Sequence, residues 1–369
     1  MRKAVAPMAW EFRQWRRQWL HWALFVLGFA VLAGSYGVAV RQVQQASTQE
    51  YNTLLDESDR LVDADKQLAK KDQTAAVKTQ RQAVARAQRV VTAYGRALKN
   101  RQDPLLARRL AYFRLLQKPG VPFSQRSPQA IHTAIVRDRY LTAQHLTPRE
   151  NAATLTPAAF FVASQNVVVF LAFLVIVILQ TANLFGSDWE QGSIRLLLTL
   201  PGVRRQLRWH KLRLAALISG AEAACWALTG YAGSAVLSRT LWGGRYPWHV
   251  AGSRVVTLTP VFWSNAATMV LLTAAVLLLL DWLSVLSRDR FTAVAATVAI
   301  LVSGALFFGA AADQWLAALN PFYQLGLTAH IAARALGPYT GTALGVDAAL
   351  VMILALLGGR TAQRAAQHF

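Results

Sequence analysis

The sequence predicts an all-α polytopic membrane protein with six transmembrane helices in a 1 + 5 arrangement. A helical extracellular domain is expected between the first and second of them. Hydrophobic residues make up 54% of the 369 residues, and the mean hydropathy is +0.28. Charged residues reach only 15%, against about a quarter in soluble domains. Six segments approach the roughly 20 apolar residues that cross a bilayer. These observations disfavour an ordinary soluble enzyme and a disordered chain.

The first predicted span is 20–40, and the other five form a predicted transmembrane domain over 160–357. The basic residues before 20–40 also fit a cleaved signal peptide. Its apolar run exceeds the roughly 7–15 residues of such a peptide, and no small-x-small cleavage site follows, so we favour an uncleaved span. The single Cys225 excludes an internal disulfide and a cysteine-based metal site. The five later spans are predicted at 160–185, 212–237, 260–286, 291–312 and 342–357.

Cationic residues near the spans predict the orientation of the chain. Fifteen lie on one side of the expected bilayer, within 2–17, 195–213, 288–290 and 360–364, and four lie in the short loops opposite. This asymmetry places both termini in the cytoplasm, including the tail 358–369. We expect a multi-pass protein of a bacterial plasma membrane.

The segment 1–19 alternates aromatic and cationic residues at helical spacing. Trp15, Trp19 and Trp22 are interleaved with the cations of 13–17. Such a pattern favours an amphipathic helix lying on anionic lipid in the interface. A simple aromatic belt with a positive-inside anchor is the alternative.

The segment 41–159 is predicted as the extracellular helical domain and carries a net charge of +10. Heptad-like apolar steps break at 70–73 and then resume, which indicates a helical hairpin. Pro104 opens a further amphipathic helix, and Ser127-Pro128 begins another that extends to about Leu146. The basic faces of this predicted domain are interpreted as solvated surface. Alternatively, they contact anionic lipid, a cell-wall polymer or an acidic substrate. The outside location excludes nucleic acid. The apolar positions of the hairpin are Tyr51, Leu54, Leu61, Leu68, Val77, Val84, Ala87, Val91, Tyr94 and Leu98.

A cytoplasmic link joins the second and third predicted spans. Ser187 and Asp188 are candidates for a helix N-cap, and Glu190 would then favour the dipole of the first turn. Pro201 ends the apolar stretch, and a basic helix leads back into the membrane. We therefore expect a short helix over 187–200, lying across the mouth of the bundle.

Polar side chains inside spans are costly and therefore mark candidate sites. Glu222 lies at mid-depth of the third span, where it faces a translocation path or a dimer interface, or pairs with a polar neighbour. Asp281 is expected to pair with a cation at 288–290, and Asp347 to reach water. Gly220 and Gly230 of the third predicted span are small enough to let a neighbouring helix approach closely. Three further polar candidates for the path or for helix packing are Gln165, Asn166 and Gln180.

The link resembles the signature of ABC-2 type transporter permeases. In that signature an acidic residue, Gly and Ser begin a leucine-rich helix, followed by Pro, basic residues and a Lys before the next span. Gln191 departs from the charged residue that the family often has there. A weaker match, Asn320-Pro321-Phe322-Tyr323, resembles the motif that introduces an outer re-entrant helix. The resemblance covers about 160–357. The matching residues of the link are Glu190, Gly192, Ser193, Leu196, Leu197, Leu198, Leu200, Pro201, Arg204, Arg205 and Lys211.

This resemblance implies a permease subunit of an ATP-driven exporter that works by alternating access. The chain itself has no phosphate loop of the form G-x-x-x-x-G-K-[ST] and is not expected to be an enzyme. A separate P-loop ABC ATPase would carry ATP-Mg, and this chain would bind no cofactor or metal. The partner would be a second copy or a second permease. The residues implied to couple to the ATPase are Asp188, Glu190, Gly192, Ser193, Leu197, Pro201, Arg204, Arg205 and Lys211. Dipole matching by Glu190 and lipid anchoring by the cations are the alternatives.

Three other functions remain open from the sequence. A non-transporting sensor or immunity protein would bind a peptide or envelope ligand with its extracellular helices. An ion channel or secondary carrier would need a line of polar residues through several spans, and a lipid-modifying enzyme would need a catalytic His or carboxylate. The cargo is equally open among peptide, lipid, drug and ion.

Overall fold

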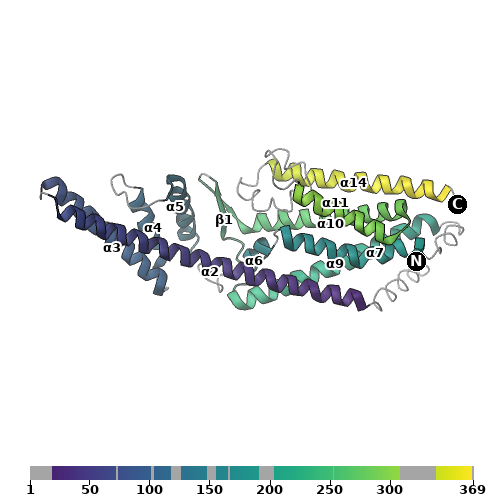
Figure 1. Ribbon diagram of the computed structural model, residues 1–369, viewed down its shortest axis with the longest axis horizontal. Coiled ribbons are helices and arrows are strands. Elements are labelled where there is room, and N and C mark those ends of the chain that lie inside the picture. Colours follow the sequence, from purple (N-terminus) through teal and green to yellow (C-terminus); the bar gives the residue numbers. More distant parts are fainter. Residues whose placement is uncertain are drawn as a thin grey trace.

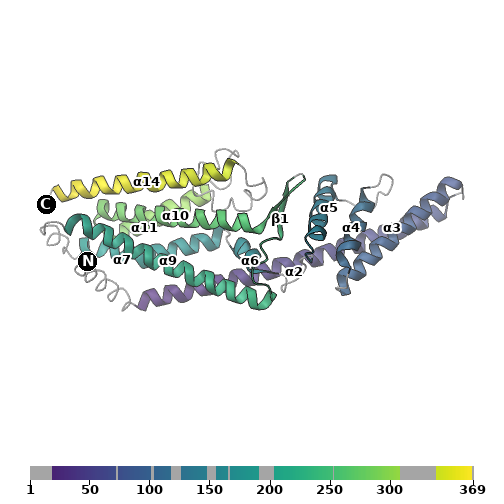
Figure 2. The ribbon, with the colours of Figure 1, turned by 180° about the vertical axis from the view of Figure 1, so that it is seen from behind.

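The computed structural model describes residues 19–71, 74–100, 104–117, 126–147, 155–164, 167–190, 203–251, 253–307 and 338–367. The molecule is elongated, with a bundle of long helices at one end and a narrower helical arm at the other (Figures 1 and 2). The arm comprises the second half of α2 (Trp19–Ala69) with α3 (Ala75–Asn100), α4 (Leu105–Leu116) and α5 (Pro128–Ala143).

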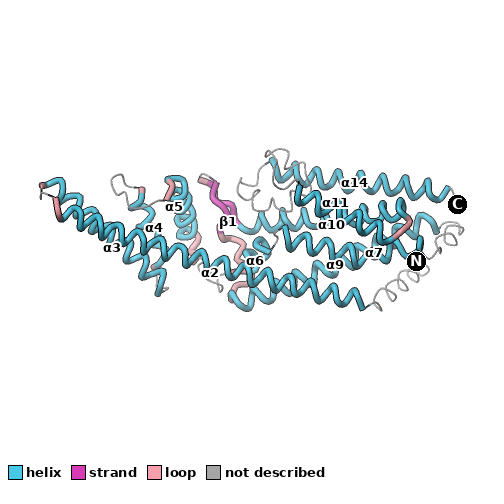
Figure 3. Tube along the Cα trace, in the orientation of Figure 1, coloured by secondary structure: helices cyan, strands magenta, loops and turns pink. Residues whose placement is uncertain are grey.

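Within the described residues, the bundle contains the first half of α2 and six further helices, which are mostly aligned with one another (Figure 3). The terminal end of the bundle is defined as the end where α2 begins and α14 ends (Figure 1). The remaining bundle helices are α6 (Pro157–Ser164), α7 (Val167–Glu190), α9 (Val203–Ser238), α10 (Leu258–Ser287), α11 (Arg290–Phe307) and α14 (Pro338–Gln367).

Helix α2 runs without a break for 51 residues, from the bundle into the arm. The expected boundary between a span at 20–40 and a separate domain from 41 therefore falls inside one helix. Residues 41–69 contain no Pro or Gly, so nothing in the chain interrupts the ladder of backbone hydrogen bonds. The predicted tail at 358–369 is likewise a continuation of α14 as far as Gln367.

The arm confirms the predicted helical hairpin. Leu54 and Leu61 of α2 are buried against Val91 and Tyr94 of α3, and the turn lies between Ala69 and Ala75 as expected. Burying each such side chain contributes about 1.5–3 kcal/mol.

The next two helices of the arm begin and end close to the predicted boundaries. Pro104 precedes the first residue of α4. The Ser127 hydroxyl caps α5 by accepting a hydrogen bond from the Ala130 N–H. Helix α5 ends at Ala143, slightly before the expected Leu146.

Five described helices are long and apolar enough to cross a membrane, by length and composition. They are α2, α10 and parts of α7, α9 and α14, which cover Val169–Gly186, Arg208–Ser238 and Leu344–Thr361. The predicted span at 291–312 corresponds to α11, whose apolar part Arg290–Gly304 is shorter. The predicted span at 160–185 begins in α6 and continues in α7.

One feature of the chain departs from an all-helical fold. Strands β1 (Pro247–Ala251) and β2 (Arg254–Thr257) form an antiparallel hairpin between α9 and α10. The hairpin lies between the arm and the bundle (Figure 3). The Tyr140 hydroxyl of α5 donates to the Arg245 carbonyl at 3.0 Å. The hairpin loop therefore connects the arm to the bundle, although the short loop carried no alternating pattern that predicted strands.

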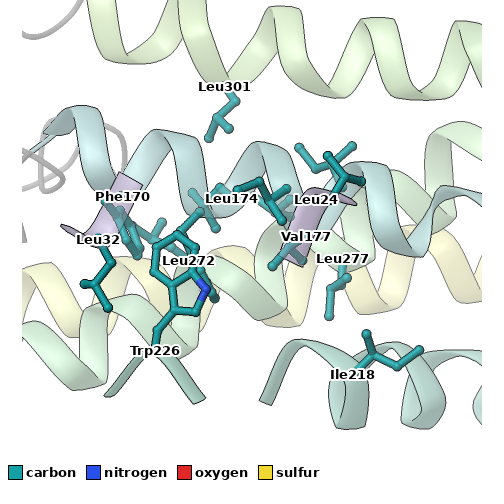
Figure 4. Close-up of a cluster of buried hydrophobic side chains, with 14 of the residues drawn as sticks. Leu24, Leu32, Phe170, Leu174, Val177, Ile218, Trp226, Leu272, Leu277 and Leu301 are labelled. Atoms are coloured by element: carbon teal, nitrogen blue, oxygen red, sulfur yellow. The ribbon is translucent and has the colours of Figure 1, made fainter. Parts of the chain in front are cut away.

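The bundle core is formed by apolar side chains from α2, α6, α7, α9, α10 and α11, and Figure 4 shows part of it. The Trp226 ring of α9 packs edge-on against Phe173 of α7, with ring centroids 5.2 Å apart. Gly28 of α2 allows this ring to approach closely, because a Cβ at Gly28 would lie 2.7 Å from Trp226 Cε2. Small residues of this kind support helix packing where lipid supplies no hydrophobic driving force.

Candidate functional site

The candidate site lies at the terminal end of the bundle, where α7 leads into the link and α9 leads out of it. The predicted helix start at Ser187 and Asp188 is wrong, because α7 continues through both residues and ends at Glu190. Asp188 and Glu190 therefore lie in the last turn of α7. The polar residues Ser187, Asp188 and Glu190 thus continue the helix that the apolar residues of α7 began. The rest of the predicted link, including Gly192, Ser193, Leu197 and Pro201, lies outside the described residues.

Helix α9 begins at Val203, so the predicted basic helix and the third span are one continuous element. Arg204 and Arg205 lie in its first turn. Lys211 is buried, with 8% of its surface exposed. Burial distinguishes Lys211 from an ordinary lipid-facing cation and places it within the packed ends of the helices.

An ion pair ties the start of α9 to α10. Arg208 Nε donates to Asp281 Oδ2 at 2.7 Å, and Arg208 Nη2 lies 2.6 Å from the same oxygen. Gly358 of α14 leaves room for the pair, because a Cβ there would collide with the Arg208 guanidinium. The expectation that Asp281 pairs with a cation at 288–290 is therefore wrong. Packing of α9 and α14 against α10 supplied a partner that is remote in sequence.

A second contact ties the end of α7 to α11. The Arg290 guanidinium donates to the side-chain oxygen of Asn183. Gly186 lies directly against Arg290, since a Cβ there would be 2.6 Å from Arg290 Cβ. Gly186 and Asn183, in the last two turns of α7, are thus the residues through which α7 meets the start of α11.

The turn between α10 and α11 joins the two contacts. Arg288 adopts a left-handed conformation (φ 55°) and its N–H donates to the Ser284 carbonyl, which ends α10. Asp289 then caps α11, accepting the Thr292 N–H at 2.7 Å. Hydrogen bonds to this carboxylate from the Thr292 hydroxyl and from the Thr292 N–H lower the pKa of Asp289. Helices α7 and α9 flank the link. Helix α9 is bound to α10, which leads into this turn, and α7 is bound to the start of α11, which follows it. We call these two contacts, Arg208–Asp281 and Asn183–Arg290, the clasp.

The remaining candidate residues lie apart from the clasp. Glu222 is on the buried face of α9, 3% exposed, and its carboxylate oxygens have no hydrogen-bond partner. Gln180 of α7 is buried as well. Asp347 is fully buried, so the expectation that it reaches water is wrong. The predicted residues Gln165, Asn166, Asn320, Pro321 and Tyr323 lie outside the described residues.

The arm holds buried charged groups that sequence patterns did not reveal. Arg109 of α4 and Asp138 of α5 form a bidentate pair, with Arg109 Nε donating to Asp138 Oδ2 at 2.8 Å. Their side chains are 5% and 0% exposed. Burial alone would lower the pKa of Arg109, but the hydrogen bond and charge of Asp138 raise it overall. An Asp among apolar positions of 128–143 was the available signal, and its partner depended on how α4 crosses α5.

A second buried carboxylate interrupts the hairpin seam. Glu57 is 2% exposed and accepts a hydrogen bond from the Tyr112 hydroxyl. Burial and this hydrogen bond raise the pKa of Tyr112 well above its usual range. Within the described ranges, no three His, Cys, Asp or Glu side chains gather into a group that could hold a metal ion.

Comparison with known proteins identifies the family. The family model for the ABC-2 family transporter protein matches residues 7–359, which includes the arm as well as the bundle. Neither the curated proteins nor the solved structures gave a match. Apolar helices and this match together indicate a membrane protein. The chain belongs to the ABC-2 transporter family, whose members are the transmembrane permease components of ABC transporters and not themselves the ATPases.

Proposed function

We propose that this chain is the permease subunit of an ATP-driven exporter, which moves its cargo by alternating access. Membership of the family supports a permease and implies an ABC ATPase partner in general. The working unit would be a homodimer, or a heterodimer with a second permease, on two ATPase subunits that bind ATP-Mg. Both termini would lie in the cytoplasm, the arm outside, and the cations of 2–17 on anionic lipid.

The clasp is the observation that carries this proposal. The link between α7 and α9 is where a cytoplasmic partner would push. Arg208–Asp281 and Asn183–Arg290 are hydrogen bonds from guanidinium groups, which are short and stronger than neutral ones. A displacement of the link would therefore be passed to α10 and α11 rather than absorbed at the ends of α7 and α9. Packed helix interfaces convert such small shifts into discrete rearrangements.

The link residues divide between docking and transmission. Asp188, Glu190, Arg204 and Arg205 flank the link and are proposed, with Gly192, Ser193, Leu197 and Pro201, as the ATPase contact. Lys211 is buried and lies within electrostatic reach of Asp281. We therefore propose that Lys211 supports the Arg208–Asp281 contact of the clasp and is not part of the docking surface.

The experiment is affinity purification of the tagged chain from its native membrane, with mass spectrometry of what remains bound. A stoichiometric P-loop ATPase is expected with the wild-type chain and should be lost in Glu190→Arg or Gly192→Pro. Arg208→Leu should keep the ATPase bound but lower coupled ATP hydrolysis about tenfold. A tenfold change corresponds to about 1.4 kcal/mol, which is close to the free energy of one hydrogen bond to a charged group. Arg213→Leu is the matched control, because Arg213 is an exposed cation on the same helix.

The outcomes separate docking, transmission and the rival function. Undiminished ATPase binding in Glu190→Arg, at normal expression, would refute the docking assignment. Equal hydrolysis in Arg208→Leu and Arg213→Leu would refute the clasp as the transmitting contact. No ATPase under gentle extraction would instead favour a sensor, whose ligand site would be the polar cavity of about 520 Å³ beside Arg126 in the arm.

A further inference from the structure

A cavity of about 400 Å³ lies inside the bundle, between α2, α6, α7, α9 and α10. This volume falls within the range of about 300–1,000 Å³ that is typical of small-molecule sites. Its walls are aromatic and aliphatic. Figure 4 shows Leu32 and Phe170 beside the Trp226 ring, and all three line the cavity.

The lining leaves almost no polar group for a ligand. Among the described residues of the lining, the hydroxyls are those of Ser219 and Thr273. Ser219 donates to the Ala215 carbonyl at 2.9 Å and Thr273 to the Met269 carbonyl at 2.7 Å, so each is satisfied within its own helix. In the described part of the lining, the Trp226 indole N–H is the side-chain donor that has no acceptor. A bare ion or a peptide would lose its hydration here without compensation.

The cavity opens sideways, between α9 and α10. Gly220 of α9 and Val270 of α10 line the cavity and are both exposed, Val270 by 68%. Other large apolar side chains of the same two helices are exposed too: Leu217 and Leu228 of α9 by 57% and 66%, and Trp263 of α10 by 64%. In a transmembrane bundle this surface meets lipid tails. A ligand that reaches the opening from this side therefore arrives through the bilayer and not through water.

We propose that this cavity takes an acyl chain of a lipid-like molecule, which enters from the bilayer between α9 and α10. The proposal narrows the cargo of the exporter to molecules with an apolar chain, and in that respect rests on the proposed function. Binding itself does not, because it requires neither the ATPase nor ATP. Movement of α10 through the clasp would change the shape of one wall of the cavity.

Two glycines of α9 make a matched pair of test variants. A Cβ at Gly220 or at Gly233 would meet nothing within 4 Å, so both positions have open space where a larger side chain would begin. Gly220 lines the cavity and Gly233 does not. We therefore expect Gly220→Leu to narrow the cavity, while Gly233→Leu adds the same side chain to the same helix away from its lining.

The experiment labels the purified chain in phosphatidylcholine nanodiscs that contain a photoactivatable phosphatidylcholine with a diazirine near the end of one acyl chain. Mass spectrometry should find adducts within 216–227 and 266–277 of the wild type and of Gly233→Leu. Gly220→Leu should lose about tenfold of this labelling, as expected when two methylenes are displaced from the cavity. Equal labelling of the two variants, or no adduct in those segments of the wild type, would overturn the proposal.

A cross-linking measurement tests the other possible occupant. Val270→Cys, in a Cys225→Ser background, should form no efficient disulfide between copies in the same nanodiscs. A high yield would place a second copy of the chain over the opening and overturn lipid entry. Copurification of the ATPase together with absent acyl labelling would leave the exporter in place and refute the acyl cargo alone.

Discussion

The buried Arg109–Asp138 pair offers the sharpest test of the arm. Asp138→Asn keeps the size of the side chain but removes the charge that offsets the Arg109 guanidinium, which is only 5% exposed. Breaking a buried ion pair by removing one partner costs about 3–5 kcal/mol. We expect a loss near this range, because both hydrogen bonds of the bidentate contact involve the same carboxylate.

The assay is hydrogen exchange of the full chain in detergent, followed by mass spectrometry of peptides from α3, α4 and α5. The free energy of opening of these helices should fall by about 3 kcal/mol or more in Asp138→Asn. The exposed pair Arg81–Asp65 is the control, with side chains 39% and 41% exposed. Asp65→Asn should change the same free energy by less than about 1 kcal/mol.

The double replacement Arg109→Met with Asp138→Leu completes the test. Replacing both charges by apolar side chains of similar volume should restore most of the stability, because neither desolvated charge remains. Equal effects of Asp138→Asn and Asp65→Asn would refute the reasoning, since burial would then make no difference to the cost. If the double variant is as unstable as Asp138→Asn, the two side chains are needed for packing at this site and not for compensating each other's charge.

Three further predictions concern packing and pH. Gly28→Ala should lower the stability of the detergent-solubilised chain by about 1–3 kcal/mol, because the new Cβ meets Trp226; Gly34→Ala, where a Cβ meets nothing, should not lower it. The raised pKa of Tyr112 stabilises the arm below about pH 10, and this contribution is lost as pH rises further, so Tyr112→Phe should flatten the alkaline part of a melting profile. The lowered pKa of Asp289 acts in the opposite sense. The stability that this cap contributes is present at neutral pH and is lost when the pH is lowered through the pKa of Asp289. Asp289→Ala should therefore flatten the acidic part.

The elements of the arm were largely predictable, because their signals are local. Heptad-like spacing placed Leu54, Leu61, Val91 and Tyr94 in one seam, and Ser127 marked the start of α5. The strands at 247–257 were not predictable in the same way. Their pairing is supported by contacts to α5 and to the neighbouring loop, and not by an alternating pattern of their own.

The candidate site was predictable in position but not in contacts. Composition and the E-x-G-S pattern pointed to the link after the second span, and the family match agrees with the resemblance. The partner of Asp281 was assigned by proximity in sequence to 288–290, whereas the structure pairs it with Arg208. Sequence distance is a poor guide here, because parallel and antiparallel helices bring residues of one membrane depth together across large separations.

By itself the sequence determined which segments are apolar enough to cross a bilayer, where the helices of the arm turn, and which family the chain belongs to. Those properties depend on composition, period and short motifs along one chain. Only the tertiary structure decided that α2 unites arm and bundle, that the clasp joins both sides of the link to α10 and α11, and that an apolar cavity opens between α9 and α10. These features depend on which faces of separate helices meet, and helix crossing is set by side-chain packing between elements and not by any pattern within one of them.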